Sequence, residues 1–228
     1  MKAGVEGAAK GAMDSLLEPI KQLTGEFCAE VGTAGGYIGK LIRLKTWLWT
    51  MQRAKQMLAD TGIEPRSIPP KLFLPIMENA SLEDDETLQE KWAALLANSA
   101  NPNSKPGVHV AFAGILKELS PEEAGLLHNI YCYVCRQIVM ENLPRHSTSA
   151  QRIDLIEAMK GYGTIHLFDV SELQPMIDNL QRLRLVETNA LLESAAGIPD
   201  FDTDFHMTAF GFEFVTACRP PGSSPWHD

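Results

Sequence analysis

Residues 81–99 read SLEDDETLQEKWAALLANS, the pattern of an amphipathic helix that faces a core. Large apolar side chains recur there at spacings of three and four residues, which places them on one face of a helix. These residues are Leu88, Trp92, Leu95 and Leu96. Ser81 with Asp84 forms a capping signal, and the acidic residues beside them fall in the first turn, where the helix dipole favours negative charge. We therefore predict that Trp92 anchors this helix against the helices that follow it.

The same periodicity extends to both sides of this stretch, so most of the chain is predicted to be helical. Apolar residues at similar spacing predict an amphipathic helix within 15–58, ended by Gly62 and Pro65. Further helices are predicted at 74–79, 81–99, 108–119, 121–141, 153–159, 171–183 and 209–218, and short strands at 185–188 and 205–207. The predicted fold class is mostly α: a helical bundle with a small winged-helix-like two-stranded β element near the C-terminus.

Three of these helices begin at residues that favour capping. Ser120 is followed by Pro121, which suits the first position of a helix because proline lacks the N–H that would be unpaired there. Ser171 with Gln174 forms a capping box. Thr208 precedes the last helix and is predicted to cap it.

Charge and composition limit the class of protein. Hydrophobic residues make up 45% and charged residues 21% of the 228 residues, which excludes wholesale disorder and a fibrous protein. The formal charge is −9, so nucleic acid is the less favoured partner. Residues 1–60 nevertheless hold eight basic and six acidic residues, a net charge of +2. The remainder therefore carries −11, and this asymmetry indicates parts with different roles.

We predict four parts along the chain. Residues 1–65 form an N-terminal amphipathic helical arm, 66–142 a helical core, 143–219 a winged-helix-like C-terminal part, and 220–228 a disordered tail. No signal peptide or bilayer-spanning run is evident, which predicts a cytoplasmic protein, with membrane association as the alternative.

The arm contains the candidate contact residues. Basic residues and two tryptophans alternate between positions 40 and 55, a combination that suits an anionic membrane or an acidic protein partner. They are Lys40, Arg43, Lys45, Trp47, Trp49, Arg53 and Lys55. Gly32 and Gly36 have the spacing that lets two helices approach closely, which also makes a homo-oligomer plausible. The alternatives are an ordinary packed helix with a basic outer edge, and an arm that folds back on its own acidic body.

No motif in the chain predicts catalysis. Residues 32–40 lack the glycine and hydroxyl positions of a phosphate loop, and the six histidines are scattered. Cys132 and Cys135 form one C-x-x-C in an apolar helical run, whereas zinc would need a second pair. We interpret them as buried thiols that bind no metal. No catalytic, cofactor-binding or metal-binding residues are therefore predicted, and no cofactor.

Four stretches occur in an order that resembles the abortive-infection alpha family of bacterial phage-resistance proteins. They are PIMENAS at 75–81, WAALLA at 92–97, LSPEEA at 119–124 and MTAFG at 207–211. Met207 stands where the family usually has Leu. The resemblance covers roughly residues 30–218, and no catalytic residues are carried over with it.

The resemblance implies a role in antiviral defence. Because the shared stretches read as caps and packing residues, we favour a non-enzymatic sensor or effector that acts through protein or membrane contacts. A DNA-binding regulator that uses the winged-helix-like part is one alternative, although the helix at 171–183 offers only Arg182 against Glu172 and Asp178. An enzyme without a linear motif is the other.

Overall fold

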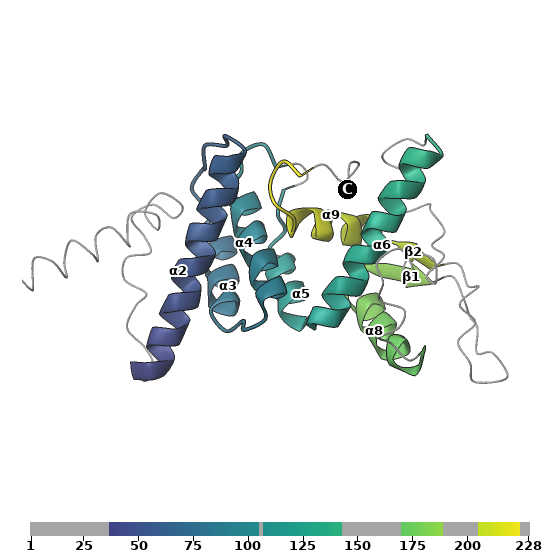
Figure 1. Cartoon of the computed structure of the whole chain (residues 1–228), viewed down its shortest axis with the longest axis horizontal. Helices are drawn as coiled ribbons and strands as arrows, with labels where there is room; N and C mark the ends of the chain where they lie inside the picture. Colours follow the sequence, from purple (N-terminus) through teal and green to yellow (C-terminus); the bar gives the residue numbers. More distant parts are fainter. Residues whose placement is uncertain (1–36, 105–106, 143–169, 189–204, 224–228) are drawn as a thin grey trace, which may run out of the picture. The chain divides into compact units, whose positions relative to one another are not determined.

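The computed structural model describes residues 37–104, 107–142, 170–188 and 205–223 (Figure 1). In these ranges the chain forms seven helices and one antiparallel sheet of two short strands, which confirms the mostly α fold class. The predicted helix at 153–159, the part of the predicted first helix before residue 37, and the Gly32/Gly36 pair lie outside the described residues.

The chain clusters into two compact units. Unit 1 comprises residues 1–118 and 217–222, and unit 2 comprises residues 119–216 and 223–228. Residues 220–222, from the predicted tail, therefore cluster with unit 1, and Pro221 is buried. The division into four parts made from the sequence has other boundaries and stays a prediction.

Unit 1 is built around helix α4 (Glu86–Ala100). Its other helices are α2 (Tyr37–Asp60), α3 (Pro70–Ala80) and α5 (Ala111–Glu118). The predicted core face is confirmed, since Leu88, Trp92, Leu95 and Leu96 are all buried. The prediction named only helices that follow this one as its partners, and so it missed the main ones. The main partners of α4 are α2 and α3, which precede it in the sequence, and α3 in turn packs on α5.

The start of α4 differs from the capping signal that the sequence offered. Asp85 is the N-cap residue, and its side chain accepts a hydrogen bond from the backbone N–H of Leu88 at 2.9 Å. Ser81 instead ends α3, because α3 is longer than predicted and reaches Ala80. A capping side chain serves only the helix whose first N–H groups it can reach, so Ser81 cannot cap a helix that begins at Glu86.

Unit 2 contains α6 (Pro121–Met140), α8 (Val170–Arg182), and strands β1 (Val186–Thr188) and β2 (Phe205–Met207). It also contains α9 (Ala209–Ala217) as far as Thr216. The strands pair with Val186 opposite Met207. Helix α6 contacts α8 and β2. Its predicted capping by Ser120 is confirmed, with reciprocal hydrogen bonds between Ser120 and Glu123. Ser171, however, lies inside α8 and is not its N-cap.

The turn from β2 into α9 depends on two residues. The Thr208 hydroxyl donates to the carbonyl oxygen of Arg184 at 2.7 Å and accepts from the N–H of Gly211 at 2.8 Å. The predicted cap is therefore confirmed, and the same hydroxyl also joins the start of α9 to the residues before β1. Gly211 lies directly against the backbone of Leu185, and a Cβ placed on Gly211 would overlap the Leu185 carbonyl oxygen.

Candidate interaction surface

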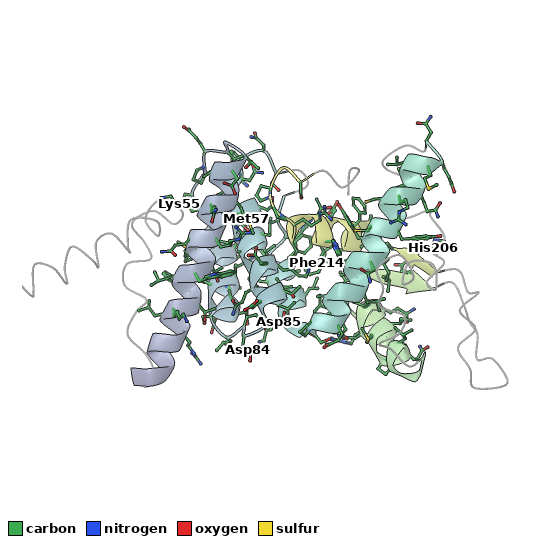
Figure 2. The ribbon with its side chains drawn as sticks, viewed as in Figure 1. Lys55, Met57, Asp84, Asp85, His206 and Phe214 are labelled. Atoms are coloured by element: carbon green, nitrogen blue, oxygen red, sulfur yellow. The ribbon has the colours of Figure 1, made fainter. Side chains whose placement is uncertain are left out.

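Helix α2 carries all seven candidate contact residues, and its second half is part of the core of unit 1. Met51, Ala54, Met57 and Leu58 are buried, and α2 packs on α4. Figure 2 labels Met57. Spacings of three and four residues place these side chains on one face of the helix. From Thr50 onward α2 is therefore a structural helix of unit 1.

The two candidate tryptophans also lie partly in this packing. The indole of Trp47 meets the ring of Phe73, in α3, edge to face at a centroid distance of 6.2 Å. Trp49 is half-buried. Side chains that already contact their own unit have less apolar area to offer a membrane than the sequence indicated.

The basic candidates fall into two groups. The Arg53 guanidinium pairs with the Glu90 carboxylate of α4, with its Nε 2.8 and 2.9 Å from the two oxygens. Lys55 is exposed further along the helix, and Figure 2 labels it. Arg43, Leu44 and Lys45 are exposed as well, and Lys40 lies one turn before them in the helix. Nothing is assigned to the side chain of Lys40, which is outside the part described.

Arg43, Leu44 and Lys45 make up what we call the basic end of α2. Consecutive helical residues differ by 100° around the axis, so three adjacent exposed residues cover more than half of the circumference. Figure 1 agrees, because the first turns of α2 extend past the ends of α3 and α4. The basic end is thus an exposed stretch of helix that carries positive charge and one apolar side chain, Leu44, which is 49% exposed.

A second charged surface was missed from the sequence. Between Lys71 and Lys91 the chain has no basic residue and six acidic ones, namely Glu78, Glu83, Asp84, Asp85, Glu86 and Glu90. We call Leu82, Glu83, Asp84 and Glu86 the acidic turn, and it joins α3 to α4 (Figure 2). The charge run itself was the signal that could have revealed it, but its acidic residues were interpreted only as favourable for a helix dipole.

The predicted thiol pair lies in α6. Cys132 and Cys135 are both buried, and the Cys132 sulfur lies 3.6 Å from the Nε2 atom of His128. Within the described ranges, no three His, Cys, Asp or Glu residues are grouped so that they could hold a metal ion. Absence of bound metal stays a prediction.

A third cysteine is buried in the C-terminal segment of unit 1. The side-chain amide of Asn98 donates to the carbonyl oxygens of Ala217 and Arg219 at 2.9 and 2.8 Å, and so fixes this segment on α4. Cys218 lies between those two carbonyls in the sequence. Burial raises the pKa of its thiol from 9.0 to about 12, against an opposing effect of the nearby Lys91 charge.

This pKa predicts a loss of stability in alkali. A thiol whose pKa is higher in the folded than in the unfolded state stabilises the fold fully below the unfolded pKa, and this contribution is lost as the pH rises from 9.0 toward about 12. Between about pH 8 and about pH 10.5 we expect a loss of roughly 2 kcal/mol from this group. Urea unfolding at both pH values measures it. Cys218→Ala should lose less stability over the same interval, and an identical loss in both proteins would contradict the assignment.

Helix α8, which precedes the two-stranded sheet, is not a basic helix. Helix α8 carries Arg182 as its one basic residue, and that guanidinium donates to the Asn179 side chain of the same helix at 3.0 and 2.7 Å. Asn179 also donates to Glu123 at 2.8 Å, which ties α8 to the start of α6. A winged-helix-like use of this part stays a prediction, and DNA binding gains no support from these contacts.

These elements define a mostly α-helical protein with an exposed basic end on helix α2. None of the helices in the described ranges has the length and apolar character needed to cross a membrane. The chain belongs to the abortive infection alpha family, whose model matches residues 48–218, and this associates it with defence against phage. The match begins just after the basic end. Neither the curated proteins nor the solved structures that were searched contain a match.

Proposed function

We propose that this chain acts in abortive infection as a non-enzymatic sensor or effector, and that it contacts its partner through the basic end of α2. The observation that carries the proposal is the run of three exposed residues, Arg43, Leu44 and Lys45, on a helix whose later turns are held in the core. A rigid helix that presents charge beside an apolar side chain suits recognition of an acidic protein surface.

A protein partner is favoured over a membrane by the positions of the aromatic side chains. Binding at a membrane interface draws on tryptophans that can leave water together with the basic residues. Here Trp47 contacts Phe73 and Trp49 is half-buried, so Leu44 is the exposed large apolar residue of the basic end.

Phage challenge of cells that carry the full-length gene tests the proposal. We expect Arg43→Glu/Lys45→Glu to lose protection, because the reversed charges repel an acidic partner. Lys55→Glu is the matched control, since Lys55 is exposed on the same helix outside the basic end, and it should protect as well as the unaltered protein.

Immunoblots must show equal amounts of the three proteins in the cells. Full protection by the double variant, or an equal loss in the control, would contradict a role for the basic end. If the unaltered protein floats with anionic vesicles and the double variant does not, the basic end binds a membrane and not a protein.

A further inference from the structure

Unit 1 contains two neighbouring segments of opposite charge. Residues 31–59 hold five basic residues and no acidic one, whereas residues 72–90 hold six acidic residues and no basic one. The first segment includes most of α2, and the second includes most of α3 and the first turns of α4. Such complete separation of charge is the pattern of surfaces that select a partner by sign.

The two segments already form one ion pair inside the chain. Arg53 of α2 pairs with Glu90 of α4 at 2.8 Å. Further along, the N–H of Arg66, just beyond α2, donates to the carbonyl oxygen of Ala100 at the end of α4. The helices α2 and α4 therefore run in the same direction, with their ends of higher residue number together.

The basic end lies further from this ion pair than the start of α4 does. Arg43 lies ten residues before Arg53, about 15 Å along α2, at a rise of about 1.5 Å per residue. Glu86 lies only four residues before Glu90, about 6 Å along α4. By this measure Arg43 lies about 9 Å further along the shared helix direction than Glu86, the one residue of the acidic turn that belongs to α4.

The acidic turn has a fixed backbone and outward-facing charges. The Glu83 carboxylate accepts the backbone N–H groups of Asp84 and Asp85, and Asp85 caps α4. Asp84 and Glu86 are exposed beside Leu82, which is 57% exposed. The turn thus repeats the composition of the basic end with the opposite sign: two exposed charges and one exposed leucine.

We infer that the basic end of α2 docks on the acidic turn of a second copy of this chain. The inference rests on the proposed function, since it names the partner of the same surface. The first turns of α2 and the turn between α3 and α4 lie at the same end of unit 1 (Figure 1). Two copies related by a two-fold axis therefore place each basic end on the other copy's acidic turn, a self-complementary contact of the kind that closes a dimer.

Sedimentation velocity of the purified full chain tests this arrangement. We expect a reversible dimer that weakens in high salt, because salt screens exposed charges. Arg43→Glu/Lys45→Glu and, separately, Asp84→Lys/Glu86→Lys should each raise the dissociation constant by at least about tenfold. Mixing the two variants should restore a dimer. One contact then pairs the two reversed surfaces and the other pairs the two unaltered surfaces, so opposite charges meet at both.

Lys55→Glu and Glu64→Lys are the matched controls. Both residues are exposed in unit 1 but lie outside the two surfaces, and their reversal should leave the dimer intact. Circular dichroism and thermal unfolding confirm that each variant is folded. If a double reversal unfolds the protein, Arg43→Gln/Lys45→Gln takes its place and should weaken the dimer in the same direction.

Failure of the inference is distinct from failure of the proposed function. A chain that stays monomeric at every concentration overturns the dimer, as does a dimer that both double variants preserve or that mixing fails to restore. If the chain is always monomeric and Arg43→Glu/Lys45→Glu still abolishes phage protection, the proposed function holds and the partner is not a second copy. A dimer that behaves as expected while the variants still protect would overturn the proposed function alone.

Discussion

Trp92→Ala is expected to lower the free energy of unfolding by about 3–5 kcal/mol, the range measured when a buried large aromatic is truncated. Trp92 is among the largest fully buried side chains, and it lies in the helix around which unit 1 is packed. Its indole N–H also faces the Glu83 carboxylate at 3.4 Å. Truncation therefore leaves a cavity between α4 and its neighbours. Urea unfolding followed by circular dichroism measures the loss.

Leu82→Ala provides the control for this experiment. Leu82 is also a large apolar residue of unit 1, but it is 57% exposed, so its truncation removes little buried surface. We expect a change within about 0.5 kcal/mol. Equal effects of the two substitutions would show that Trp92 is not in the core. Most domains are stable by only about 5–15 kcal/mol, so the Trp92 variant should also be scarce in cells.

Gly211→Ala is expected to destabilise the protein by about 3 kcal/mol or more, at the upper end of the range for overpacking. The added methyl group would overlap the Leu185 carbonyl oxygen and approach the Leu185 carbonyl carbon and Cα at 2.8 and 2.9 Å. These are backbone atoms, which cannot turn aside as the end of a flexible side chain can. The start of α9 would have to move away from β1, and the Thr208 cap would be lost with it. Thermal unfolding of the full chain measures the effect.

Gly125→Ala is the matched control in the same unit. Gly125 lies inside α6, and a Cβ there would meet no atom within 4 Å. Alanine is a better helix former than glycine, so this substitution should stabilise the protein by about 0.5–1 kcal/mol. A Gly211→Ala protein as stable as the unaltered one would disprove the close approach of α9 to Leu185.

These two predictions explain why the family's shared stretches carry no visible chemistry. WAALLA supplies the buried centre of α4, LSPEEA supplies the capping box of α6, and MTAFG supplies the cap and the close approach of α9. Each is a packing or backbone requirement. Substitutions in these stretches are therefore expected to abolish phage protection by lowering the amount of folded protein, whereas substitutions at the basic end should act on folded protein.

Some features followed from the sequence because they depend on residues close together in the chain. Periodicity placed Trp92 and its neighbours on one buried face, and the boundaries of α6 followed from Ser120 and the end of an apolar run. The two short strands were also found. The Thr208 cap was found because a hydroxyl before an apolar helix acts on N–H groups within one turn. Local signals failed where two helices competed for one cap, as at Ser81, which ends α3 instead of starting α4.

The candidate surface was only half predictable. Sequence spacing grouped seven residues between 40 and 55, but it could not separate Arg53, which pairs with Glu90 37 residues later, from the exposed Arg43 and Lys45. Nor did it connect the acidic run at 78–90 with the basic run, because charge pairing between helices depends on which faces meet. By itself the sequence determined the mostly helical class, the caps at Ser120 and Thr208, and the separation of charge. Only the tertiary structure decided which of those charges are used internally and which remain for a partner, because helix packing brings together residues that no local spacing relates.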